Sequence, residues 1–149
     1  MNLDVLIFAA HPDDAELAMG GTIAKLTKRG IKVGIIDITR GELGTRGTFE
    51  TRQREAFNAA IALKVAVREN LEIPDGDIRN SKENLIKVII EIRKFKPKAI
   101  FAPYFNDRHP DHIDASHLIK RAMFSTGLSK IKTFDKEVPQ NHYRPEKLF

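Results

Sequence analysis

The sequence predicts one α/β domain over residues 1–149, with three layers (α/β/α) around a mainly parallel sheet. Short apolar runs such as DVLIFAA (4–10) alternate with longer amphipathic segments, which is the pattern of β-α-β crossovers. The apolar runs are continuous, and continuous runs are typical of parallel strands that are buried on both faces. A chain of 149 residues also has the length of a single domain.

The first half of the chain supplies two strands and two helices. After the buried strand 4–10 we expect a helix at 14–29, which has Leu17 and Ile23 among its apolar residues and Gly30 as a left-handed cap. KVGIIDIT (32–39) predicts a second buried strand. Helix 50–64 follows a glycine-rich loop, and its apolar stripe consists of Ala56, Phe57, Ala60, Ile61 and Leu63.

The second half continues the alternation, which makes the order of elements Rossmann-like. A short strand is expected within residues 65–78, before a Pro-Asp-Gly turn. Ser81 suits the N-cap of helix 82–95, which Pro97 stops. Strand 98–104 and helix 111–125 follow. The tail is polar and poorly patterned, and it ends on KLF, which has the character of a strand that is just starting.

Composition excludes several classes of function. The net charge of +5 suggests nucleic acid as a partner, but acids lie between the scattered basic residues and no nucleic-acid motif is present. A solvated basic surface is the better interpretation.

The chain has no cysteine, so thiolate ligands and nucleophiles are excluded, and a reducing compartment fits. The N-terminal apolar run is too short for a signal peptide or a membrane span. We therefore expect a cytoplasmic protein with no membrane or nucleic-acid partner.

Three polar segments follow predicted strands: HPDD (11–14), RGELGTRGTFETR (40–52) and NDRHPDH (106–112). In open parallel sheets the ligand site lies outside the carboxyl ends of the strands. His11, Asp14 and His112 can then form a two-histidine, one-carboxylate metal site, with Zn²⁺ or Fe²⁺ as the expected ion. Asp13 beside Asp14 suits a general base that acts on water at the metal. The alternative for either aspartate alone is a helix cap.

Two further groups suit the same chemistry. His109, oriented by Asp111, can stabilise an oxyanion or protonate a leaving amine. The alternatives are that His109 is also a metal ligand, or that Asp111 only caps the last helix. Arg52, near the glycine-rich loop, can hold an anionic substrate group.

The segments AHPDDAELAMGGTIAKL, TRGELGTRGTFETRQREA and APYFNDRHPDH together resemble the PIG-L/LmbE-like family of metal-dependent N-acetylglucosamine deacetylases. They are most similar to the branch that acts on N-acetylglucosaminyl-malate in bacillithiol biosynthesis. The resemblance implies that His11, Asp14 and His112 bind zinc and that Asp13 is the base. It also implies that His109, held by Asp111, is an electrostatic stabiliser and general acid, and that Arg52 contacts the substrate.

The expected function is therefore hydrolysis of the acetamide of an N-acetylglucosamine conjugate. Family members assemble as multimers, so a homo-oligomer, for example a hexamer, is expected. They also continue further than Phe149, which implies that the C-terminal part of the usual domain is missing here. Two alternatives remain: a deacetylase of another N-acetyl amino-sugar conjugate, and a non-catalytic remnant that binds metal or sugar.

Overall fold

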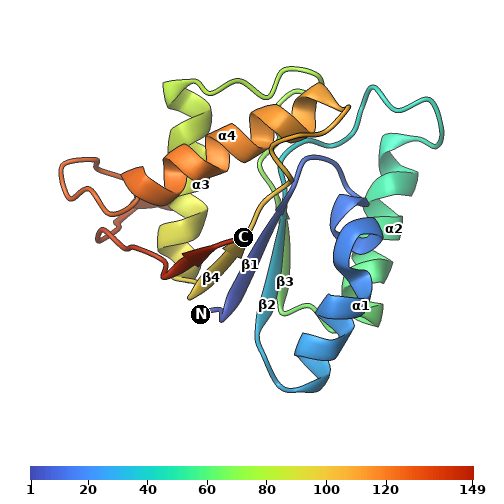
Figure 1. Ribbon diagram of the computed structural model, residues 1–149, viewed down its shortest axis with the longest axis horizontal. Helices are drawn as coiled ribbons and strands as arrows, with labels where there is room; N and C mark the ends of the chain where they lie inside the picture. Colours follow the sequence, from blue (N-terminus) through green and yellow to red (C-terminus); the bar gives the residue numbers. More distant parts are fainter.

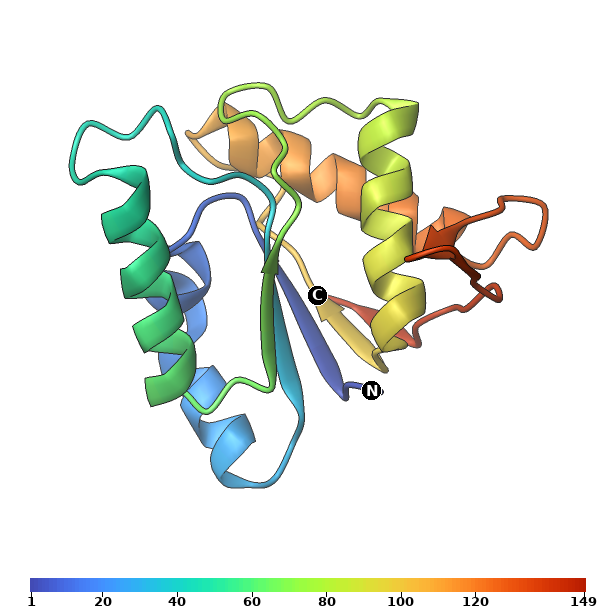
Figure 2. The ribbon, with the colours of Figure 1, turned by 180° about the vertical axis from the view of Figure 1, so that it is seen from behind.

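The computed structural model describes all residues from Met1 to Phe149 and confirms the predicted three-layer α/β fold. The main sheet has five strands in the order β3-β2-β1-β4-β7, and every neighbouring pair is parallel. Helices α1 and α2 lie on one face of this sheet, and α3 and α4 lie on the other (Figures 1 and 2). The elements are β1 (Val5–Ala9), α1 (Asp14–Lys28), β2 (Val33–Asp37), α2 (Phe49–Ala62), β3 (Val67–Asn70), α3 (Lys82–Phe95), β4 (Ala99–Phe101), α4 (Pro110–Ser125), β5 (Phe134–Asp135), β6 (Val138–Pro139) and β7 (Lys147–Leu148).

The alternation of side chains along the strands builds two hydrophobic cores. In β1, Val5 and Ile7 join the core beneath α1, whereas Leu6 and Phe8 join the larger core beneath α3 and α4. Successive strand residues point to opposite faces, so an apolar residue at every position is required when both faces are covered. This arrangement explains the continuous apolar run at the start of the sequence.

The order of the strands places the functional edge. The chain adds β2 and then β3 on one side of β1, and it adds β4 on the other side. The direction of winding therefore reverses between β1 and β4. A reversal of this kind opens a crevice outside the carboxyl ends of the two strands, where ligands bind in open α/β sheets. The segments that follow β1 and β4 are HPDD and NDRHPDH.

The helix signals in the sequence are mostly confirmed. The Ser81 side chain accepts a hydrogen bond from the amide of Asn84, which begins α3, and Lys96 ends that helix in the left-handed conformation with φ of 46°. Gly30 has φ of +79°, as expected for a left-handed residue after α1. The terminal KLF segment forms β7, a short edge strand parallel to β4.

Three features of burial and of the tail are not apparent from the sequence. Helix α2 contains no buried residue, and Phe57 and Ile61 of its expected apolar stripe are exposed. In α1, Leu17 is 81% exposed. Within the polar tail, β5 and β6 form a two-stranded antiparallel sheet. These exposed apolar residues show that apolar side chains at helical spacing do not by themselves prove that a helix face is covered.

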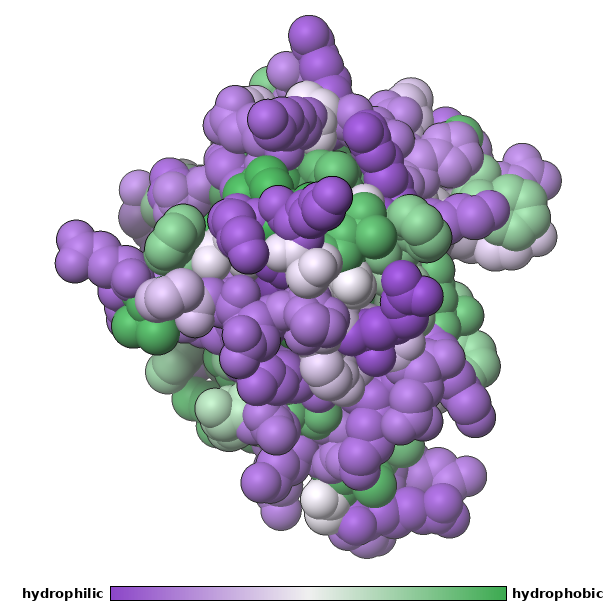
Figure 3. Space-filling view, turned by 90° about the vertical axis from the view of Figure 1, so that its left-hand side faces the viewer, coloured by the Kyte–Doolittle hydropathy of each residue, from purple (hydrophilic) through white to green (hydrophobic).

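The face formed by α3, α4 and the tail is largely hydrophilic, with apolar side chains in small separate groups (Figure 3). Such a surface agrees with the scattered arrangement of basic and acidic residues in the sequence. No helix combines the length and the apolar character that crossing a membrane requires.

Candidate metal centre and active site

The three predicted metal ligands meet at the carboxyl edge of the sheet. His11 lies two residues beyond the end of β1, Asp14 is the first residue of α1, and His112 lies in the first turn of α4. The proline between His11 and Asp13 limits the backbone of this short connection. The β1–α1 connection therefore supplies two of the ligands, and the start of α4 supplies the third.

The distances among these side chains suit one divalent ion. Asp14 Oδ2 lies 3.3 Å from His11 Nδ1 and 3.3 Å from His112 Nε2. All three potential ligand atoms lie within 4.8 Å of one another. Metal–ligand bonds of about 2.0–2.1 Å in a tetrahedral site separate neighbouring ligand atoms by roughly 3.3–3.4 Å. The residues present therefore fit a metal ion with three protein ligands and an open position.

Carboxylates hold the far nitrogen of each candidate ligand histidine. His11 Nε2 lies 3.1 Å from both Asp75 Oδ1 and Asp111 Oδ2. His112 Nδ1 lies 3.0 Å from Asp107 Oδ2. A carboxylate that accepts the proton of one ring nitrogen fixes the tautomer and leaves the other nitrogen free to bind a metal. This pattern on both histidines supports a metal site more strongly than the distances alone.

The electrostatics of the site keep its carboxylate ionised. Burial alone would lower the pKa of His11, but hydrogen bonds with Asp14 and Asp111 outweigh burial and raise it to about 9. Burial would raise the pKa of Asp14, but its hydrogen bonds with His11 and the charge of His112 lower it. A cation at the position between the three side chains is thus favoured, whether it is a proton or a metal ion.

Asp13 has an exposed carboxylate and is next to the candidate ligand Asp14 in the sequence. It is the N-cap residue of α1 by position, yet its side chain makes no capping hydrogen bond. Its carboxylate is 55% exposed and lies 3.7 Å from Nη2 of Arg52. The capping alternative for Asp13 is therefore not what the structure shows, and the carboxylate is accessible to a substrate or a water molecule.

The glycine-rich loop makes room for the Arg52 guanidinium. Arg52 Nη1 donates a 2.8 Å hydrogen bond to the carbonyl oxygen of Gly41. A Cβ atom added at Gly41 or Gly44 would collide with this guanidinium, and Gly41 also has φ of +64°. The glycine spacing, which carried little information in the sequence, thus serves to seat Arg52 against the loop.

His109 and Asp111 are close to the site, but not in the expected pairing. His109 is the N-cap residue of α4, and its Nδ1 accepts a 3.3 Å hydrogen bond from the backbone N–H of Asp111. The Asp111 carboxylate instead faces His11 Nε2 and accepts a hydrogen bond from the amide of Gly76. Asp111 therefore holds His109 through its backbone, while its carboxylate orients His11. The interpretation of Asp111 as a helix cap is wrong, because His109 is the cap.

A cavity of about 430 Å³ adjoins this site, and its volume is within the range of small-molecule pockets. Of the three candidate metal ligands, His11 lines it, whereas Asp14 and His112 do not. It is lined by the catalytic candidates and by residues of two turns: His11, Asp13, Leu43, Gly44, Arg52, Asp75, Gly76, His109, Pro110 and Asp111.

Two carboxylates of the site, Asp75 and Asp107, were not predicted from the sequence. In the sequence, Asp75 is only part of a Pro-Asp-Gly turn, and Asp107 is one of several polar residues of the NDRHPDH segment.

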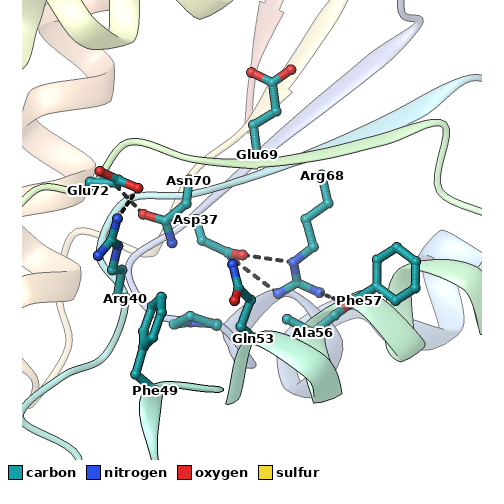
Figure 4. A pocket seen from close by; sticks show the side chains of 11 residues that line it. Asp37, Arg40, Phe49, Gln53, Ala56, Phe57, Arg68, Glu69, Asn70 and Glu72 are labelled. Atoms are coloured by element: carbon teal, nitrogen blue, oxygen red, sulfur yellow. Dashed lines mark hydrogen bonds and ion pairs between the residues drawn. The ribbon is translucent and has the colours of Figure 1, made fainter. Parts of the chain in front are cut away.

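A smaller cavity of about 230 Å³ lies between α2 and the edge of the sheet (Figure 4). Its floor is an ion pair in which Arg68 donates to both carboxylate oxygens of Asp37, at 2.7 and 3.0 Å. Burial raises the pKa of Asp37 to about 6, although the charge of Arg68 opposes this. None of the candidate metal ligands lines this cavity.

Comparisons with known proteins agree with the site. The model of the PIG-L family, described as GlcNAc-PI de-N-acetylase, matches residues 6–123. The chain belongs to the PIG-L family. The matched range contains all three candidate metal ligands of this PIG-L member, together with Asp13 and His109. A diacetylchitobiose deacetylase from Thermococcus kodakarensis is 31% identical over 143 residues, which are 88% of this chain and 53% of that protein.

Two solved structures share the fold of this PIG-L member. The conserved protein TT1542 from Thermus thermophilus superposes with a TM-score of 0.89 and is 40% identical, over 98% of this chain and 64% of the other. The N,N'-diacetylchitobiose deacetylase from Pyrococcus horikoshii superposes with a TM-score of 0.85 and is 29% identical, over 94% of this chain and 56% of the other. The chain thus spans between 53% and 64% of the length of these three proteins.

Proposed function

We propose that this chain carries the catalytic centre of a zinc-dependent deacetylase that acts on an N-acetylglucosamine conjugate. The observation that carries the proposal is the candidate metal-ligand set His11, Asp14 and His112, with the exposed, non-capping carboxylate of Asp13 next to it in the sequence. Membership of the PIG-L family and the similarity to deacetylases of N-acetylated sugars support this class of reaction.

His11, Asp14 and His112 would hold the ion, and a histidine and carboxylate set without thiolates suits zinc. A divalent ion bound there would supply a nucleophilic water at neutral pH and would polarise the amide carbonyl of the substrate. Asp13 is the general base in this proposal. Its exposed carboxylate can accept a proton from water and deliver that proton to the amine that leaves as acetate is released.

His109 is the group that faces the developing oxyanion in this proposal. Because its Nδ1 accepts the Asp111 amide proton, the neutral ring carries its own proton on Nε2. His109 lines the cavity, and an Nε2–H group there can donate a hydrogen bond to the oxyanion. Of the two roles expected for His109, this contact supports stabilisation rather than general-acid catalysis.

The natural substrate that we propose to test first is N-acetylglucosaminyl-malate of the bacillithiol pathway. Arg52 lines the cavity and can form a charge-assisted hydrogen bond with an anionic or hydroxyl group of the conjugate. The basic net charge of +5 also favours an anionic conjugate.

We further propose that residues 1–149 form one domain, that the protein acts in the cytoplasm and that it works as a homo-oligomer.

The test is acetate release by the zinc-loaded chain from N-acetylglucosaminyl-malate, diacetylchitobiose and N-acetylglucosamine. Asp13→Asn should keep its metal and lose about 10²- to 10⁴-fold in rate, the usual effect of removing a general base. Asp114→Asn is the matched control, because Asp114 is an exposed aspartate of α4 outside the cavity. A fully active Asp13→Asn variant would refute the role of the base. A metal-loaded chain that releases no acetate from any conjugate would favour the non-catalytic alternative.

A further inference from the structure

The cavity of about 230 Å³ between α2 and the edge of the sheet adjoins the cavity at the metal centre without being part of it. The two cavities share no lining residue. Pro12 lines the smaller cavity, whereas its neighbours His11 and Asp13 line the larger one. Consecutive Cα atoms are about 3.8 Å apart, so only the width of one residue separates the cavities at this point. A molecule of two rings that binds at the metal centre can therefore extend into the smaller cavity.

Arg68 holds the smaller cavity open. Its guanidinium donates to both carboxylate oxygens of Asp37 in β2 and, at 3.1 Å, to the carbonyl oxygen of Ala56 in α2. The side chain therefore spans the space between the sheet and the helix, and α2 has no buried residue that would fill this space. Because charge-assisted hydrogen bonds fix the two walls, a ligand binds in a cavity that is already formed.

The two walls of this cavity differ in character. Phe49, Gln53 and Phe57 follow one another at intervals of four residues, so they share one side of α2. Figure 4 shows the Gln53 amide projecting from α2 toward the Asp37–Arg68 ion pair of the sheet. The helix thus contributes a wall of two aromatic rings and one amide, and the sheet contributes a polar wall.

The charged side chains of the lining are already paired within the protein, in these three ion pairs: Asp37 with Arg68, Glu72 with Arg40, and Glu69 with Lys94 of α3. A lining whose charges are paired does not compensate the cost of removing an ionic group from water. The exposed Gln53 amide, in contrast, offers two hydrogen-bond donors and an acceptor. The cavity therefore suits an uncharged ligand with groups that both donate and accept, such as hydroxyl groups.

Aromatic rings beside an amide suit a sugar in particular. The face of an aromatic ring is electron-rich, so it attracts the C–H groups on the apolar face of a pyranose ring. Phe49 and Phe57 are 37% and 63% exposed, and both can give up water when such a ring binds. The volume of about 230 Å³ lies below the range of about 300–1,000 Å³ for pockets of drug-sized ligands. This size indicates a ligand of a single ring.

We propose that this cavity binds the second, uncharged sugar ring of a conjugate whose N-acetylated ring lies at the metal centre. Its role in substrate choice rests on the proposed deacetylase function, whereas the binding of the sugar does not. A conjugate in which N-acetylglucosamine carries malate has no second ring to place there. The cavity would thus add affinity for disaccharides and leave the affinity for the malate conjugate unchanged.

The experiment compares diacetylchitobiose with N-acetylglucosamine. Each is titrated by calorimetry into zinc-loaded Asp13→Asn protein, in which hydrolysis should be slow. The disaccharide should bind about tenfold more tightly, because it alone fills the second cavity. Adding Phe49→Ala should weaken its binding by about three- to tenfold, and adding Gln53→Ala by about threefold. Binding of the monosaccharide should stay the same in both.

Acetate release by the zinc-loaded chain with Asp13 intact is the second measurement. Phe49→Ala should raise the KM for diacetylchitobiose by the same factor and leave the KM for N-acetylglucosaminyl-malate unchanged. Ile61→Ala is the matched control, because Ile61 is an exposed apolar residue of α2 outside the cavity. It should behave like the wild type with both substrates.

Equal affinities for the disaccharide and the monosaccharide would overturn the proposal, as would an unchanged preference in both Phe49→Ala and Gln53→Ala. A KM for the malate conjugate that rises as much as that for the disaccharide would also overturn it, because the effect would not depend on a second ring. Failure of the deacetylase proposal would appear separately, as no acetate release by the wild type from any substrate. The calorimetric titration would still decide whether the cavity binds a sugar.

Discussion

At the residue scale, the ligands of the candidate metal centre could be predicted and their supporting carboxylates could not. HPDD and HPDH present histidine and aspartate at strand ends, which is a local pattern that the sequence displays directly. Asp75 contacts His11 across 64 positions of the chain. A contact of that separation has no signature in spacing, because it depends on where the turn after β3 lies relative to the end of β1.

Asp107 offers a test of the supporting contacts. Replacing Asp107 by Asn removes the negative charge that faces Nδ1 of His112, so the ring of this ligand is held less firmly. Loss of such a contact typically lowers metal affinity by about 10- to 100-fold. Zinc affinity measured by chelator competition should therefore fall in Asp107→Asn and remain unchanged in Asp114→Asn. Equal affinities for the two variants would argue against His112 as a ligand.

At the element scale, periodicity predicted α3 better than α2. The apolar residues of α3 at helical spacing, which include Leu85, Val88 and Ile92, are all buried, because α3 packs against both the sheet and α4. Helix α2 lies over the edge strand β3 and has no layer outside it, so its apolar residues Phe57 and Ile61 stay exposed. Sequence pattern alone does not distinguish a helix over the centre of a sheet from one over its edge.

The Arg68 side chain, on β3, contacts residues of three other elements near the site: β2, α1 and α2. It extends from β3 to both carboxylate oxygens of Asp37 in β2 (Figure 4). It also donates to Glu16 in the first turn of α1 and to the carbonyl oxygen of Ala56 in α2. Because Glu16 lies two residues after Asp14, this contact helps to fix the end of α1 that carries a candidate metal ligand.

Arg68→Lys should keep the charge and lose the two-pronged contact with Asp37. Loss of a charge-assisted hydrogen bond of this kind corresponds to about 1.5–3 kcal/mol in the free energy of unfolding. Urea denaturation of the metal-free protein measures this change. Arg54→Lys, at an exposed position of α2, is the matched control and should unfold like the wild type. Identical midpoints for both variants would show that the Arg68 contacts do not stabilise the fold.

At the scale of the whole molecule, the sequence predicted the edge of the sheet at which the site lies. Alternating strands and helices implied a parallel sheet, and three polar segments followed predicted strands. The actual order of the strands, with β4 on the opposite side of β1 from β2, came only from the structure. That order brings the end of β1 and the start of α4 together and so unites His11 with His112.

Global stability should depend on pH through a group far from the site. Burial raises the pKa of Glu91 in α3 to about 7, opposed by the charge of Lys94 and assisted by that of Glu69. The folded chain therefore holds a proton that the unfolded chain releases near pH 4.5. This contribution to stability is complete below that pH and is lost as the pH rises through about 7.

Glu91→Gln should flatten the decline of unfolding free energy between about pH 4.5 and 7. Part of the slope should remain, because burial also raises the pKa of Asp37, to about 6. Urea denaturation of the metal-free protein across this pH range provides the measurement. Glu83→Gln, an exposed residue of the same helix, controls for the loss of one negative charge. A slope in Glu91→Gln as steep as in the wild type would contradict this account.

The central claim is that His11, Asp14 and His112 hold one divalent metal ion. Its most direct test is the metal content of tag-free protein after dialysis against metal-free buffer, measured by atomic spectroscopy for the wild type, His112→Gln and His117→Gln. We predict one tightly held ion per chain in the wild type and in His117→Gln, and none in His112→Gln. A full equivalent of metal retained by a folded His112→Gln variant would contradict the claim.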